Sequence, residues 1–222
     1  MTKYIFSAIL LALVVTGGVM LMPYLKAQPY GTVIILNGPS AAGKTSIQKE
    51  FQYLMMPNLW VKLGIDSLFD GPMPTITIEN LTFWQKENPI RWVETSKDKD
   101  DNTVISLHIG EQGEKAAQGM NSAIAAYAKT GCNVIVDYIA YKKEWLDDLR
   151  SKLSGIKTHW VKIEIPLATL EEREVARGTS PKGHARSHYD TVHWDILYDF
   201  AISSDKESAV DCAKKIKSTF KL

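Results

Sequence analysis

From residue 32 onward, short apolar runs alternate with amphipathic segments. The runs have the length and β-branched content of buried strands, and the segments between them repeat apolar positions every three or four residues, as helices do. The predicted strands are Thr32–Asn37, Trp60–Asp66, Cys132–Asp137, His159–Ile165 and Phe200–Ser203. This alternation is typical of βαβ units. It predicts a single three-layer α/β/α domain, residues 30–222, around a five-stranded parallel sheet.

The helices follow from the same pattern. One begins after residue 45, with Ile47, Phe51 and Leu54 on one face, and others are predicted at Ala116–Lys129, Lys142–Leu153 and Leu167–Arg177. For the last helix we predict a capping box made by Ser204 and Glu207, because a serine followed three residues later by a glutamate satisfies two orphan amides. Its inward positions would be Ala209, Ala213, Ile216 and Phe220.

Residues 71–113 interrupt the alternation. This stretch contains three prolines, three large aromatic residues and the polar run 97–102. It predicts an insertion over the carboxyl edge of the sheet, where such segments shape substrate pockets. The polar run is interpreted as a solvated turn, since Thr103 and Ile109 stand where a calcium loop needs glycine and glutamate.

The amino-terminal residues 1–28 form a separate apolar segment. Residues 4–25 carry no charged side chain and are flanked by Lys3 and Lys26, which is long enough for a helix across a bilayer. Two alternatives stay open: a cleaved signal over residues 1–27, or translation from Met20 or Met22. We favour an apolar helix anchored in the inner membrane, with the catalytic domain in the cytoplasm where nucleoside triphosphates are found.

Composition narrows the ligand. A net charge of +1 provides no basic field for nucleic acid, so a small molecule is the default substrate. The two cysteines lack metal or redox spacing, and His184, His188 and His193 have no accompanying cysteine or regularly spaced acid. We therefore do not predict a metal site at these histidines, and we interpret His193 as a pocket or packing residue.

One motif carries the chemistry. The first predicted strand runs into Gly-x-x-x-x-Gly-Lys-Thr and a helix follows, which is the context of a true phosphate loop. Backbone N–H groups there cradle phosphates, Lys44 reaches the β- and γ-phosphates, and the Thr45 hydroxyl is placed to bind Mg²⁺. The expected ligand is ATP or GTP. The predicted nucleotide-binding residues are Gly38, Pro39, Ser40, Ala41, Ala42, Gly43, Lys44, Thr45 and Ser46.

Two acids end predicted strands, where ligands of open α/β sheets bind. We predict that Asp66 orients the acceptor hydroxyl and takes its proton; the alternative is a cap for a short helix. Asp137 suits the Mg²⁺ shell or a contact with substrate, and the alternative is a turn acid. Arg173 and Arg177 lie four residues apart and are predicted to act from a lid on the transferring phosphoryl group; the alternative is a solvated helix end.

Together, the phosphate loop, residues 64–68, the run 173–178 and the pattern at 198–208 resemble the chloramphenicol phosphotransferase family of P-loop kinases. The resemblance covers residues 32–218. It implies a shikimate-kinase-like core that moves the γ-phosphate of ATP to a hydroxyl group, with Asp66 as catalytic aspartate and Arg173 and Arg177 as lid arginines. Residues 71–102 and the amino-terminal segment depart from the family, so the acceptor is not implied.

The sequence thus predicts an ATP-dependent O-phosphotransferase with a small-molecule acceptor and Mg²⁺. One alternative is a zeta-toxin-like or nucleotide kinase, which would need a basic pocket for the acceptor's phosphate. The cations of the insertion, Lys86, Arg91, Lys97 and Lys99, are not clustered in the sequence. The other alternative is a membrane-tethered nucleotide-binding switch without an acceptor.

Overall fold

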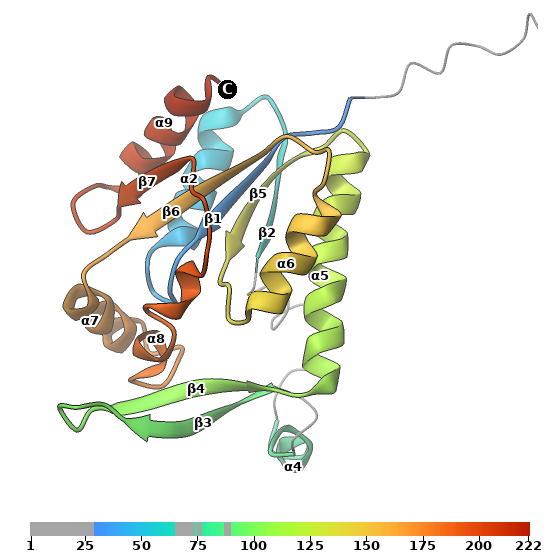
Figure 1. The fold of residues 1–222 in the computed structure, drawn as a ribbon. Helices are drawn as coiled ribbons and strands as arrows, with labels where there is room; N and C mark the ends of the chain where they lie inside the picture. The colour runs from blue at the N-terminus through green and yellow to red at the C-terminus, as the bar shows by residue number, and fades with distance from the viewer. Residues whose placement is uncertain (1–28, 65–73, 75–76, 87–89) are drawn as a thin grey trace, which may run out of the picture.

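A computed structural model of the chain describes residues 29–64, 74, 77–86 and 90–222. Its main sheet has five parallel strands in the order β2-β5-β1-β6-β7 (Figure 1). The strands are β1 (Val33–Asn37), β2 (Trp60–Gly64), β5 (Asn133–Tyr138), β6 (Thr158–Glu164) and β7 (Phe200–Ser203). The predicted five-stranded parallel sheet is confirmed. The last two residues predicted for the second strand lie outside the described part of the chain.

Helices cover both faces of this sheet. α2 (Lys44–Met55) and α9 (Ala209–Phe220) lie on one face, and α5 (Glu111–Lys129) and α6 (Lys143–Lys152) lie on the other (Figure 1). β1 is buried throughout: Ile34 and Leu36 pack towards α2 and α9, whereas Val33 and Ile35 pack towards α5 and α6. A strand covered on both sides needs no polar alternation, which explains its continuous apolar run.

The remaining elements gather at the carboxyl end of the sheet. α7 (Leu167–Arg177) follows β6, and the short α8 (His184–Ser187) and the 3₁₀ turn η1 (Thr191–His193) follow in turn. A two-stranded antiparallel sheet, β3 (Ile90–Lys97) and β4 (Thr103–Ile109), extends past this end, and α4 (Leu81–Trp84) precedes it (Figure 1). The hairpin occupies the place predicted for an insertion; its role as a substrate cover stays a prediction.

The predicted insertion ran to Gly113, but α5 already begins at Glu111. Gly113 lies inside the first turns of this helix, against the hairpin. A Cβ added there would lie 2.5 Å from Cγ1 of Ile90 and 2.8 Å from Cγ2 of Ile109. The glycine therefore permits close packing of helix and hairpin rather than ending the insertion.

The capping box predicted at Ser204 and Glu207 is wrong. α9 begins at Ala209, and its cap is Ser208, whose Oγ accepts a hydrogen bond from the Asp211 N–H at 3.1 Å. Ser204 is used elsewhere, because its N–H donates to the Glu164 carbonyl oxygen at 2.9 Å and so extends the pairing of β6 with β7.

The expected inner-membrane anchoring is contradicted. Within the described ranges, no helix combines the length and apolar character needed to cross a bilayer. The expectation rested on residues 4–25, and these, like the apolar helix predicted for residues 1–28, lie outside the described part of the chain.

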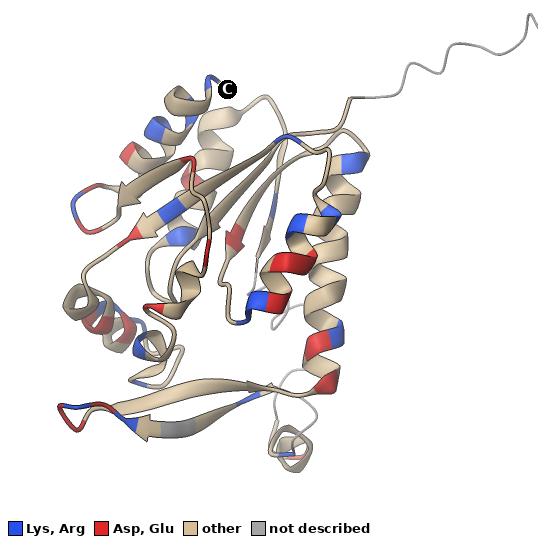
Figure 2. Ribbon diagram, viewed as in Figure 1, with Lys and Arg blue, Asp and Glu red and all other residues tan. Residues whose placement is uncertain are grey.

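Charges of both signs are interleaved on the outer helices. Along α6, lysine and arginine alternate with glutamate and aspartate, and α9 carries lysines near Asp211 (Figure 2). Two exposed pairs on α6 illustrate the pattern, Lys143 with Asp147 and Arg150 with Asp147. These surfaces are solvated faces rather than a field of one sign.

A buried amide joins the end of β1 to the segments around it. The Asn37 side chain donates to the Val192 carbonyl at 2.8 Å and to the Tyr198 hydroxyl at 2.7 Å, and it accepts from the Ala140 N–H at 3.2 Å. Asn37 is fully buried. This one side chain therefore fixes the point at which β1 ends and the phosphate loop begins.

We predict that Asn37→Ala lowers the free energy of unfolding by about 3 kcal/mol, because several buried polar groups lose their partner at once. Urea unfolding followed by circular dichroism measures the effect. Asn133→Ala is the matched control, since Asn133 is half-buried and accepts only the Thr32 N–H. Equal losses for the two variants would contradict the anchoring role of Asn37.

Candidate functional site

The phosphate loop lies between β1 and α2, at the carboxyl edge and next to the middle of the sheet. Gly43 has φ +88°, a left-handed conformation that favours glycine, and it directly precedes the first residue of α2. The loop and the amino terminus of α2 thus direct backbone N–H groups and the positive end of the helix dipole at one place. The conformation suits the anion cradle predicted from the motif, and its occupation by a phosphate stays a prediction.

The Lys44 side chain is buried within the loop. Its Nζ donates to the Pro39 carbonyl at 2.8 Å and lies 3.4 Å from Oδ1 of Asp137. The longer separation is a charge contact rather than a hydrogen bond, since Oδ1 has no hydrogen-bond partner although it is buried. Lys44 therefore lies between the loop and the carboxylate at the end of β5.

Thr45 and Asp137 converge on the same point. The Thr45 hydroxyl donates to Oδ2 of Asp137 at 2.5 Å, and Asp137 is 5% exposed. A hydroxyl and a carboxylate with one unsatisfied oxygen are hard oxygen ligands, the kind that Mg²⁺ takes alongside phosphate oxygens and water. The donor set therefore fits the predicted magnesium site.

The two arginines of α7 both reach the phosphate loop. Arg177 Nη2 donates to the Ser40 hydroxyl at 2.8 Å. Arg173 Nη2 donates to the Ser204 carbonyl at 2.9 Å, and its Nη1 lies beside Gly43. Arginines at a merely solvated helix end, the alternative to a lid, would not make these contacts. Arg177 lies at the third residue of the loop, and Arg173 lies between the loop and the end of β7.

Glu174, between these arginines in sequence, holds the segment that follows α7. Its carboxylate is fully buried. It accepts hydrogen bonds from the backbone N–H groups of Gly183 at 2.8 Å and Ala185 at 2.7 Å, and from the Ser180 hydroxyl at 3.4 Å. A buried carboxylate needs such donors. No periodicity or motif in the sequence distinguished Glu174 from its neighbours.

An ion-pair network joins the same segment to the hairpin. Arg186 donates to both carboxylate oxygens of Glu171, at 2.6 and 2.8 Å, and to Asp98 in the hairpin turn at 2.5 Å. Asp98 also accepts the N–H groups of Asp100 and Asn102. The polar run at 97–102 is thus a turn, and its first aspartate links it to α7 through Arg186.

Aromatic rings also line the cleft. The His184 ring lies 4.3 Å from the Trp92 ring, edge to face. Its Nε2 is 2.9 Å from the Tyr141 hydroxyl and its Nδ1 is 3.3 Å from the Ile105 carbonyl, so the proton is on Nδ1 and Tyr141 donates. Burial, with smaller effects from nearby Arg177 and Lys44, lowers the pKa of His184 to about 4. The ring is therefore neutral near pH 7.

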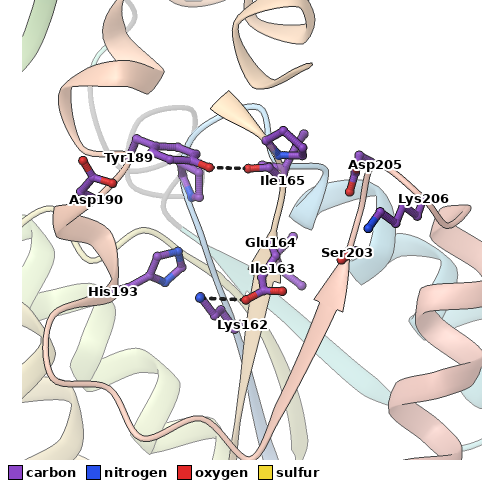
Figure 3. A pocket seen from close by; sticks show the side chains of 12 residues that line it. Lys162, Ile163, Glu164, Ile165, Tyr189, Asp190, His193, Ser203, Asp205 and Lys206 are labelled. Atoms are coloured by element: carbon purple, nitrogen blue, oxygen red, sulfur yellow. Dashed lines mark hydrogen bonds and ion pairs between the residues drawn. The ribbon is translucent and has the colours of Figure 1, made fainter. Parts of the chain in front are cut away.

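The cleft between loop, lid and aromatic wall has a volume of about 770 Å³. A smaller hollow of about 400 Å³ lies at the ends of β6 and β7, with Pro39 of the loop in its wall (Figure 3). Its wall includes Glu164, Asp190 and Asp205 against two lysines, and one of these, Lys162, pairs with Glu164 at 2.8 Å (Figure 3). The cleft suits an anion, because its three cationic side chains face a single carboxylate, that of Asp137. The hollow does not, because carboxylates outnumber the lysines in its wall.

The structure brings most of the predicted site residues together. The predicted site residues that line the cleft are Ser40, Ala41, Gly43, Lys44, Thr45, Ser46, Asp137, Arg173 and Arg177. Asp66 lies outside the described residues. Sequence reasoning assigned no role to Tyr141 or Glu174, and it considered His184 and His188 only as metal ligands, which it rejected. The spacing of four residues between His184 and His188, across a short helix, was the signal that could have indicated a shared role. Trp60 belongs to the hydrophobic core, where its ring centroid lies 5.0 Å from that of Phe51.

Comparison with known proteins identifies the family. The model of the chloramphenicol phosphotransferase-like proteins matches residues 31–221. The chain belongs to this family. Two Mycobacterium tuberculosis proteins, from strains H37Rv and CDC 1551, each named "Putative O-phosphotransferase", are 28% identical over 196 residues, covering 88% of this chain and 85% of theirs. The predicted phosphotransferase class, with an alcohol group as acceptor, is confirmed.

Solved structures place this chloramphenicol phosphotransferase-like chain in the P-loop kinase fold. The APS kinase CysC of Mycobacterium tuberculosis, in complex with AMPPNP and APS, has a TM-score of 0.56 at 16% identity, over 87% of this chain and 99% of that one. Shikimate kinase from Acinetobacter baumannii, in complex with shikimate, has a TM-score of 0.52 at 13% identity, over 89% and 97%. At these identities the likeness establishes the fold alone.

We predict that this family member loses stability as the pH falls from about 6.5 to about 4, partly through His184. In that window the unfolded histidine binds a proton and the folded one does not, so protonation favours the unfolded state. The contribution of one such group is at most about 1.4 kcal/mol per pH unit. Urea unfolding of the wild type and His184→Gln across this range isolates it from the carboxylates. Parallel curves would show that His184 does not contribute.

Proposed function

We propose that this chloramphenicol phosphotransferase-like protein transfers the γ-phosphate of ATP to a hydroxyl group of a small molecule. One observation carries the proposal: a single cleft is lined both by the phosphate loop with three cationic side chains and by aromatic rings that carry no charge. The loop suits a triphosphate. The rings suit an acceptor that is not itself an anion.

In this proposal the triphosphate occupies the loop from Gly38 to Ser46. The loop amides and Lys44 hold the β- and γ-phosphates, and Arg177 reaches the transferring group from its position at Ser40. Arg173 donates to the Ser204 carbonyl after β7, and this contact supports a role for its planar guanidinium at the nucleoside end. The two arginines would therefore act at opposite ends of the nucleotide.

Thr45 and Asp137 would hold Mg²⁺, which when bound neutralises charge on the β- and γ-phosphate oxygens. The support is the pairing of the Thr45 hydroxyl with Asp137 and the unsatisfied Oδ1 of that carboxylate. Lys44 Nζ lies 3.4 Å from this oxygen, so its positive charge faces the same place.

The transfer step conserves atoms and charge. The acceptor oxygen forms a bond to the γ-phosphorus, the bond from that phosphorus to the β,γ-bridging oxygen breaks, and ADP leaves. We propose that Asp66 orients the acceptor hydroxyl and takes its proton, which follows the family resemblance and the position of Asp66 two residues after β2 in the sequence. Arg177 and Lys44 stabilise the charge that develops on the phosphoryl and bridging oxygens.

The wall of the cleft disfavours an acceptor that carries phosphate. The described residues lining the cleft include only three cations, Lys44, Arg173 and Arg177, and all three are engaged with the loop side. A nucleotide kinase or zeta-toxin-like enzyme needs further cations for the acceptor's own phosphate. Trp92, Tyr141 and neutral His184 instead offer ring faces and hydroxyl or imidazole hydrogen bonds.

We expect Asp66→Asn to reduce phosphoryl transfer at least about a hundredfold, because it removes the proton acceptor, while ATP affinity stays unchanged. The assay is a panel of hydroxylated antibiotics and metabolites with labelled ATP, with products identified by mass. The control is Asp101→Asn, in the exposed hairpin turn.

Full activity in Asp66→Asn would remove Asp66 from the reaction. If ATP binds but none of the hydroxyl compounds stimulates its turnover in the wild type, the protein is a nucleotide-binding switch and the proposed transfer is wrong.

A further inference from the structure

One residue of the phosphate loop is held from two sides by the carboxyl-terminal half of the chain. The backbone N–H of Ser40 donates to Nε2 of His188 at 3.0 Å, and the Ser40 hydroxyl accepts from Arg177 at 2.8 Å. Ser40 is 7% exposed and His188 is 4% exposed. The third residue of the loop is thus fixed by a histidine from the end of α8 and by the lid arginine of α7.

The direction of the hydrogen bond fixes the state of the His188 ring. An amide N–H can only donate, so Nε2 must be the unprotonated nitrogen and Nδ1 must carry the proton. Nδ1 lies 3.3 Å from the Ser187 hydroxyl, which itself donates to the His184 carbonyl at 2.7 Å and keeps lone pairs to accept. An imidazolium has two donors and could not hold Ser40.

The surroundings maintain this neutral form. Burial is the main cause that lowers the pKa of His188 well below its ordinary range, and the positive charge of His184, when that ring is protonated, and of Lys44 acts in the same direction. The rings of His184 and Tyr141 pack against His188, with centroids 4.6 and 4.9 Å away. The acceptor nitrogen is therefore held rigidly and stays available across the physiological pH range.

We propose that His188 is a positioning residue for nucleotide binding: its ring anchors the Ser40 amide, which keeps the phosphate loop preformed and presents the Ser40 hydroxyl to Arg177. The inference rests on the proposed function, since it concerns the same nucleotide. It assigns a role to a side chain that touches the loop and not the reacting atoms.

The physical reason is the cost of an unpaired buried donor. Without His188 the Ser40 N–H has no acceptor in a dry environment, and the loop gains by turning that amide elsewhere. A loop that must be reordered by its ligand binds that ligand more weakly, because the ordering free energy is subtracted from the binding free energy. The Arg177 contact would be lost with it, since both depend on the position of Ser40.

The test compares three substitutions in the full chain. In His188→Gln the longer side chain brings a carboxamide oxygen close to the former Nε2 position, whereas in His188→Asn the same group is one methylene short. In His188→Leu no acceptor remains. Tyr189→Phe is the matched control, because it removes a neighbouring hydrogen bond, from the Tyr189 hydroxyl to the Ile165 carbonyl at 2.7 Å, without touching the loop.

We expect the dissociation constant and the KM for ATP to rise about tenfold in His188→Asn and His188→Leu, the loss of one buried hydrogen bond, with the KM for the acceptor unchanged. His188→Gln should recover ATP affinity to within about twofold of the wild type. Calorimetric titration with a non-hydrolysable ATP analogue and steady-state kinetics measure these values, and thermal unfolding gives the stability of each variant. Tyr189→Phe should lose stability and keep its affinity.

A merely structural role would lower the active fraction in all variants and leave both KM values unchanged. That result would overturn the inference, as would equal ATP affinity in the Gln and Asn variants. If His188→Leu does not fold, the comparison of Gln with Asn still decides. Wild-type protein that binds no ATP would instead overturn the proposed function, so the two failures are distinguishable.

Discussion

The cradle of backbone amides between β1 and α2 is the feature on which the other parts of the site depend. Amide donors can be directed at one point only if the strand that ends there is fixed. β1 is buried on both faces and paired on both edges, and Asn37 ties its end to three other segments. The rigid centre of the fold therefore determines where a phosphate chain can be held.

The strands on either side of β1 position the charged side chains of the site. β5 ends at the Asp137 region and places that carboxylate against Thr45, and β6 leads into α7, whose arginines return to the loop. Buried Glu174 holds the segment after α7 in place by accepting backbone N–H groups. Burial, and to a smaller extent the nearby cations, lower the pKa of both His184 and His188, so the two rings are neutral. Neutral rings can accept hydrogen bonds, and at these two positions they do.

Much of this arrangement was predictable from the sequence because it depends on local patterns. Runs of β-branched residues predicted the five strands, and the spacing of glycines and lysine predicted the phosphate loop. Asp137 was singled out because it ends a predicted strand, and Arg173 and Arg177 because they lie four residues apart on a predicted helix. What failed depended on tertiary contacts. Ser208 rather than Ser204 caps α9 because Ser204 pairs with Glu164. Glu174 and His188 act through backbone groups distant in sequence, for which no spacing rule exists. The membrane expectation is contradicted because no helix of the described residues is long and apolar enough to cross a bilayer, and Asp66 stays a prediction.

The most direct measurement is calorimetric titration of the purified chain with ATP and magnesium, for the wild type and for Lys44→Ala. The account predicts saturable binding to the wild type and a loss of affinity of at least about tenfold in the variant, because Lys44 is the buried cation in the cradle. A wild-type chain that binds neither ATP nor GTP would contradict it. So would a Lys44→Ala variant with unchanged affinity, since the triphosphate would then be held somewhere other than this loop.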